Sequence, residues 1–129
     1  MLNRTSRIRV PNRLVNEIVD FLMDQLGNYS DLSIDVVVPP PPRTSRYFDD
    51  LDVKVEIISP AATEKFNFEA KYDPTNSVLY INLSYFEHEY EEDDIEDALF
   101  RVVSHELVHV YQIFYTRARE NDPNAVSPT

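Results

Sequence analysis

Residues 99–114 read LFRVVSHELVHVYQIF and lie within a segment of helical periodicity. When consecutive residues are placed about 100° apart, the apolar side chains fall within one stripe, as an amphipathic helix requires. The stripe consists of Leu99, Val103, Leu107, Val110 and Phe114. The pattern predicts a helix from about Asp93 to Arg119, with Asp93 and Asp94 at the positive end of the helix dipole. We expect the apolar stripe to face a sheet.

The side of this helix opposite the stripe carries two histidines. His105 and His109 lie about 40° apart on the helical wheel, because residues four apart stack one above the other. Two imidazoles placed in this way can converge on one ion, and zinc accepts imidazole nitrogen at about 2.1 Å. In this H-E-x-x-H arrangement, Glu106 is placed to take a proton from a zinc-bound water and pass it to the leaving amine. The sequence therefore predicts a zinc site on this helix.

Upstream of this helix, the sequence predicts a second helix and several short strands. Apolar residues recur at helical spacing from about Asn12 to Leu26, and Gly27 can serve as a left-handed cap. Strand patterns occur at residues 33–38, 53–58, 66–71 and 77–83, with a proline-rich loop at 39–50 and a turn at 73–76. We predict an α+β fold: an N-terminal helix packed on a three- or four-stranded, mainly antiparallel meander, followed by a long C-terminal helix.

Length and composition predict a single domain over residues 1–129. Apolar residues make up 43% of the chain and charged residues 27%, which is ordinary for a folded protein. A basic arm is expected at residues 1–10 and a polar tail at 120–129. No cysteine is present, so histidine, carboxylate or water must hold any metal. Without a signal-peptide pattern or a membrane-spanning apolar run, we expect a soluble, cytoplasmic protein with no membrane partner.

The net charge of −11 argues against a nucleic-acid partner, because phosphate binding depends on clustered Lys and Arg. Eight of the eleven residues from Glu87 to Asp97 are acidic, and the rest of the chain is nearly neutral. We interpret this run as a solvated loop that leads into the charged start of the long helix.

The segment from Val102 to Tyr111, VVSHELVHVY, resembles the extended active-site signature of the zincin metallopeptidases. The predicted order of helix, strands and motif helix is also similar to the upper subdomain of a gluzincin, and the size is similar to that of the single-domain minigluzincins. The resemblance implies a zinc-dependent peptidase that acts on a peptide or protein substrate. It also implies that an edge strand near Ser77 to Leu83 receives the extended substrate. By the same resemblance, one tyrosine among Tyr80, Tyr85, Tyr90, Tyr111 and Tyr115 polarises the tetrahedral intermediate, and Tyr111 and Tyr115 are the closest to the motif in sequence.

The third zinc ligand is where this sequence departs from the known patterns. Gluzincins use a glutamate on a later helix, for which the residues after His109 leave no room. Metzincins use a histidine six residues on, where this chain has Tyr115. His88 and Glu120 are the leading candidates, and Asp122 ranks behind them. Glu120 reaches the metal only if the helix breaks early. A second copy of the chain in a homo-oligomer is another source.

Two other interpretations stand beside the peptidase. A zincin-like module that lacks activity would bind a protein partner or use metal only for stability. An ordinary α+β protein would carry the motif by chance, with its histidines exposed or hydrogen-bonded and Glu106 paired with Arg101, with Arg117 or with neither. An enzyme differs from both because it needs a third ligand and an open coordination position.

Overall fold

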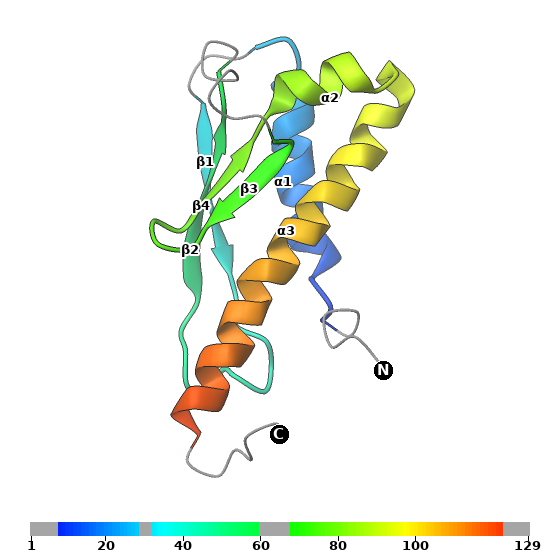
Figure 1. Cartoon of the computed structure of the whole chain (residues 1–129). Coiled ribbons are helices and arrows are strands. Elements are labelled where there is room, and N and C mark those ends of the chain that lie inside the picture. Colours follow the sequence, from blue (N-terminus) through cyan, green and yellow to red (C-terminus); the bar gives the residue numbers. More distant parts are fainter. Residues whose placement is uncertain (1–7, 29–31, 60–67, 123–129) are drawn as a thin grey trace.

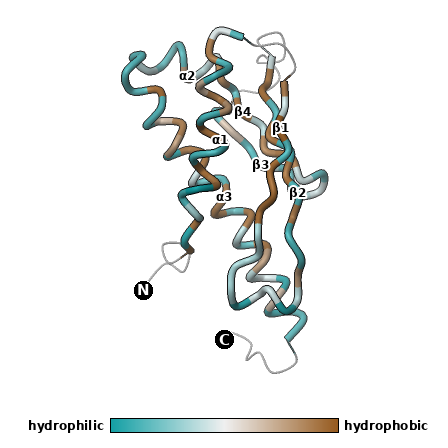
Figure 2. The backbone as a smooth tube through the Cα atoms, turned by 180° about the vertical axis from the view of Figure 1, so that it is seen from behind, coloured by the Kyte–Doolittle hydropathy of each residue, from teal (hydrophilic) through white to brown (hydrophobic). Residues whose placement is uncertain are grey.

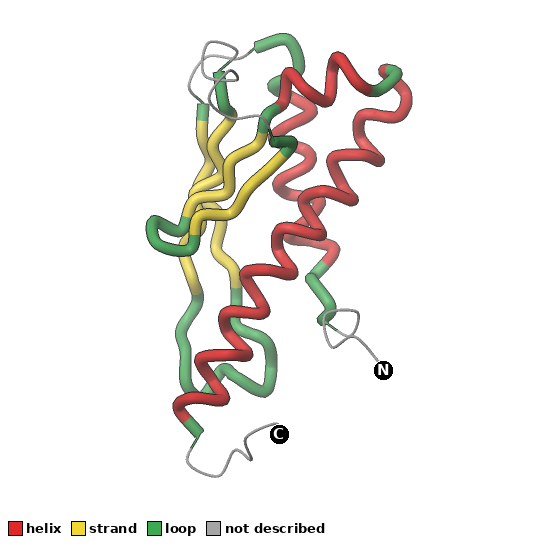
Figure 3. Tube along the Cα trace, viewed as in Figure 1, coloured by secondary structure: helices red, strands yellow, loops and turns green. Residues whose placement is uncertain are grey.

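A computed structural model describes residues 8–28, 32–59 and 68–122 of the chain. The elements are α1 (Asn12–Asp24), β1 (Ser33–Val38), β2 (Leu51–Ile57), β3 (Ala70–Asp73), β4 (Val78–Ile81), α2 (Leu83–Glu89) and α3 (Glu92–Asn121). The helices lie on one side of the four-stranded sheet, so the fold is a two-layer α+β arrangement (Figure 1 and Figure 3). The predicted α+β class is confirmed.

The first helix, α1, begins at the predicted residue and ends two residues early. Its buried face consists of Leu14, Val15, Ile18, Val19 and Leu22. After Asp24, the backbone N–H of Gln25 donates to the Leu22 carbonyl at 3.0 Å, which tightens the chain into a turn. Gly27 follows with a φ of 80°, the left-handed conformation that glycine adopts without steric cost.

The sheet has the order β1-β2-β4-β3, which differs from the predicted meander. The pairs β1–β2 and β3–β4 are antiparallel, whereas β2 and β4 are parallel. Three of the four residues in β4 are buried, which suits a central strand that is paired with a neighbour at each edge. In β3 no residue is fully buried, which suits an edge. The predicted strand at 66–71 lies partly outside the described residues, and β3 continues to Asp73.

The short helix α2 was not predicted. The strand expected at 77–83 ends at Ile81, because Asn82 caps a helix: its side chain accepts from the Tyr85 backbone N–H at 3.4 Å and from Ser84 Oγ at 2.9 Å. Phe86, with no exposed surface, anchors α2 in the core. The acidic run is therefore not a loop: it covers the end of α2, a break after Tyr90 and the first turns of α3.

The long helix α3 confirms the predicted amphipathic pattern. Each residue of its apolar stripe is at most 6% exposed and belongs to the core: Leu99, Val103, Leu107, Val110 and Phe114. Figure 2 shows apolar residues recurring along α3 and concentrated in the strands. The predicted loop at 39–50 is also confirmed. It packs against the C-terminal half of α3, where the rings of Phe48 and Phe114 are 5.8 Å apart. Within the described ranges, no helix is long and apolar enough to cross a membrane.

If α2 is part of the core, Phe86→Ala should lower the free energy of unfolding by about 3–5 kcal/mol, because the substitution leaves a cavity among buried side chains. Urea unfolding followed by circular dichroism measures this change. Val37→Ala is the matched control: Val37 is 53% exposed and should change stability by no more than about 0.5 kcal/mol. Equal effects of the two substitutions would contradict the packing of α2.

Candidate active site

His105 and His109 project from the middle of α3 and are both exposed. Their ring centroids are 4.9 Å apart with the ring planes at 89°. The Nδ1 atom of His109 lies 3.0 Å from Oε1 of Gln112. An amide oxygen only accepts, so this pair forms a hydrogen bond when the neutral ring carries its proton on Nδ1, the tautomer that leaves the Nε2 lone pair available. A hydrogen bond of this kind orients metal-binding histidines in many zinc sites.

Glu106 lies on the boundary between the core and the histidine face. Its side chain is only 9% exposed, although its neighbour His105 is open to solvent. Burial raises the pKa of the Glu106 carboxyl, and the nearby His109 and His105 oppose this shift. Glu106 forms no ion pair with any residue in the described part of the chain, where Arg101 instead pairs with Asp97 at 3.6 Å. The predicted alternative partners, Arg101 and Arg117, therefore do not engage Glu106.

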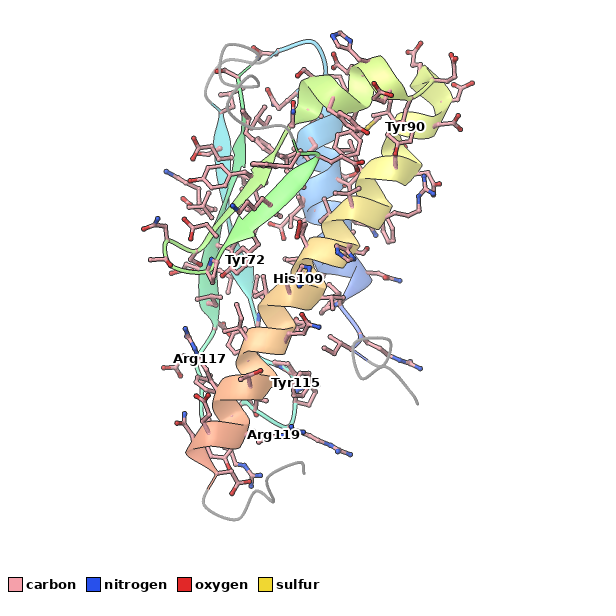
Figure 4. The ribbon with its side chains drawn as sticks, viewed as in Figure 1. Tyr72, Tyr90, His109, Tyr115, Arg117 and Arg119 are labelled. Atoms are coloured by element: carbon pink, nitrogen blue, oxygen red, sulfur yellow. The ribbon has the colours of Figure 1, made fainter. Side chains whose placement is uncertain are left out.

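Two open grooves between α3 and the β3 side of the sheet meet at Glu106. The His109 groove, of about 610 Å³, contains Glu106 and His109 and is lined from the strand side by Lys71 and Tyr72. The His105 groove, of about 450 Å³, contains His105 and Glu106 together with Glu69, Ala70, Tyr90 and Arg101. Figure 4 shows Tyr72 beside His109. A molecule lying along β3 would therefore pass the Glu106 carboxyl.

The resemblance implied that the segment Ser77 to Leu83 offers a free strand edge to the substrate, and the structure differs on this point. The segment Ser77 to Leu83 contains β4, which is paired on both sides by β2 and β3 and has no free edge. The strand that faces the motif is β3, the last strand of the sheet, which lines both grooves. Its outer edge has no partner strand among the described residues.

The tyrosines near the motif also differ from expectation. Tyr111 is only 3% exposed and packs beside Phe114, and burial raises its pKa to about 12. Tyr115 is exposed on the side of α3 away from the sheet (Figure 4). Neither lines a groove that contains Glu106; Tyr72 and Tyr90 do. Proximity in sequence does not identify the tyrosines that line the grooves, because each step along the helix turns the side chain by about 100°.

The structure does not gather a third ligand around the histidine pair. Across residues 8–28, 32–59 and 68–122, no group of three or more His, Cys, Asp or Glu side chains is placed to hold a metal. His88 is exposed on α2, and Asp122 follows the end of α3. Glu120 lines the His109 groove, but α3 continues unbroken to Asn121, so its backbone is about 16 Å along the helix from His109. The two imidazoles fit two of the three protein positions of a catalytic zinc site.

No protein family, curated protein or solved structure matches the chain. The functional argument therefore depends on the geometry of the motif and the chemistry of the two grooves.

The buried carboxyl of Glu106 should cost stability at neutral pH. Its pKa in the folded protein is raised above the ordinary value of 4.5, so its stabilising contribution is present below that value and is lost as the pH rises through the folded pKa. We expect metal-free Glu106→Gln protein to melt at a higher temperature than wild type near pH 7, with the difference vanishing below about pH 4. Thermal unfolding in the presence of a chelator measures the melting temperatures of the two proteins at each pH.

Glu120→Gln, an exposed carboxyl on the same helix, is the matched control and should leave the melting temperature nearly unchanged. A Glu106→Gln protein that melts at or below the wild-type temperature at neutral pH would contradict the assignment of Glu106 as a destabilising buried acid.

Proposed function

We propose that the chain is a zinc-dependent peptidase whose centre is the His105, Glu106 and His109 face of α3. The observation that carries the proposal is the position of Glu106: a mostly buried carboxyl with a raised pKa, between two exposed imidazoles, where two grooves meet beside an unpaired strand edge. Buried acids of this kind are uncommon outside functional sites, because burial of an unpaired carboxylate opposes folding.

His105 and His109 are the residues that would hold the ion. Zinc bound there would polarise a peptide carbonyl and lower the pKa of a bound water. The contact between His109 Nδ1 and Gln112 Oε1 supports this role, since it favours the tautomer that presents Nε2. Residues four apart lie on the same side of a helix, and the two imidazole rings are 4.9 Å apart with perpendicular planes.

Glu106 would move the proton. Its carboxylate oxygens accept a proton from water, and the raised pKa makes the protonated form easier to keep until the leaving amine takes it. The mostly buried position also limits competition from bulk water. The role needs no other acid or base from the chain.

An extended peptide would bind by adding a strand to β3. Main-chain hydrogen bonds to the outer edge of Ala70–Asp73 would align the peptide with α3, and the two grooves would receive side chains on either side of Glu106. Tyr72 and Tyr90 line opposite grooves and are the tyrosines best placed to contact the substrate.

The third ligand is proposed from the sequence candidates. Glu120 shares a groove with His109, but about 16 Å of unbroken helix separates them, so His88, Asp122 and a second copy of the chain are the candidates that the helix geometry leaves. One observation favours a second function, a catalytically inactive zincin-like binding module: the described residues contain no assembled three-ligand group. Such a module would use the same strand edge to bind a protein without cleaving it.

Metal content decides between these functions. After zinc is offered and excess metal removed by dialysis, wild-type protein should retain about one zinc per chain, as a single site requires, and His105→Ala should lose it. Elemental analysis measures both values. Glu106→Gln should keep the metal but lower kcat for a peptide substrate by about 10²–10⁴, because it removes the base and not a ligand.

His88→Ala is the informative control, because it tests a third-ligand candidate without touching the motif. A protein that binds no zinc would rule out the peptidase. A protein that holds zinc but cleaves no peptide from a mixed library would leave the binding module as the function.

A further inference from the structure

The His109 groove contains two cations in a chain of net charge −11. Lys71 enters the groove from β3 and Arg117 from α3. Neither forms an ion pair in the described residues, where Arg101–Asp97 is the ion pair observed. The Nζ atom of Lys71 lies 5.9 Å from the Phe68 ring centroid, a contact that leaves its charge available.

Arg117 is directed toward the sheet side by its place on the helix. It follows Val110 by seven residues and therefore projects from the same face as the buried stripe. Figure 4 shows Arg117 on the sheet side of α3 and Arg119 on the other. Arg117 also lines a small cavity of about 180 Å³ with Asp49 and Asp50, but is paired with neither.

The acids near this pair form no ion pair with it in the described residues. The Asp73 side chain accepts hydrogen bonds from Asn76 and from the Thr75 backbone, which commits it to its own turn. Glu120 lies one helical turn beyond Arg117 at the far end of the groove, without an ion pair between them. The groove therefore holds two cations, Lys71 and Arg117, and two carboxylates, Glu106 and Glu120, with no ion pair between them in the described residues.

The His105 groove has the opposite character. Its cation, Arg101, is already paired with Asp97, and its strand side carries the carboxylate Glu69. A peptide lying along β3 would thus meet positive charge on one side of Glu106 and neutral or negative charge on the other. The net negative charge of the chain repels acidic peptides, but salt screens this repulsion beyond about 8 Å. Any preference for an acidic peptide must therefore come from short-range contacts in the groove.

We propose that the His109 groove selects substrates with an acidic side chain on one fixed side of the scissile bond, and that Lys71 and Arg117 bind its carboxylate. This rests on the proposed function, whose substrate class it names. The guanidinium of Arg117 presents paired donors that match a carboxylate, and Lys71 adds a point charge from the strand side.

Binding is measured separately from cleavage. The Glu106→Gln protein, supplied with zinc, is titrated against fluorescent peptides that are identical except for one Glu or Gln moved through the sequence. At one position, the Glu peptide should bind roughly three- to tenfold more tightly than its Gln counterpart, the range expected of one or two exposed ion pairs. Added salt should remove most of the preference.

Adding Lys71→Gln and Arg117→Gln to this protein should abolish the preference while leaving the affinity for the Gln peptide unchanged. Arg119→Gln is the matched control, since it removes one positive charge from the opposite side of the same helix and should keep the preference. Equal affinities for the Glu and Gln peptides at every position, or a preference that survives the double substitution, would overturn the inference.

Wild-type protein with the same peptides separates this inference from the proposed function. Cleavage without an acidic preference would overturn the inference and leave the peptidase intact. An acidic binding preference that depends on Lys71 and Arg117, with no cleavage by wild type, would overturn the peptidase and support the charge-selective groove.

Discussion

The packing of the α3 stripe against the sheet and α1 fixes the orientation of every residue in the candidate site. Leu99, Val103 and Leu107 are at most 1% exposed, and burial of each contributes about 1.5–3 kcal/mol. Rotating the helix by one residue in one direction would place Ala98, Val102 and Glu106 at these positions, so that a carboxyl would replace Leu107 in the core. The histidines therefore face outward because the leucines and valines face inward, and Glu106 falls at the boundary between them.

Local periodicity predicted the elements whose structure depends on their own residues: α1, β1 and α3. Local periodicity failed where pairing between segments distant in sequence determines the order of the strands. The parallel pairing of β2 with β4 brings together segments separated by β3, and the alternation of Leu79, Ile81 and Leu83 continued beyond the end of the strand. The change from strand to helix depends on one side chain, Asn82, whose capping bonds outweigh the alternating pattern.

The site divides in the same way. The motif was predictable because its three residues lie on one helix, where spacing alone sets their relation. Glu69, Lys71 and Tyr72 were not, since they reach the motif from a strand whose position in the sheet no local pattern determines. Arg117 did leave a signal: an arginine at a position of the apolar stripe, seven residues after Val110, indicates a cation directed toward the sheet side.

In a site formed by a strand edge and a helix, main-chain contacts and side-chain contacts contribute differently to substrate recognition. Main-chain bonds along β3 would align any extended peptide, so they cannot distinguish one sequence from another. The edge spans only four residues, which limits the affinity that those bonds supply. Discrimination must then come from side chains that line the grooves, and two cations without an ion pair in the described residues, Lys71 and Arg117, line one of them. Alignment by β3 and selection by charge are thus separable, because they use different atoms of the substrate.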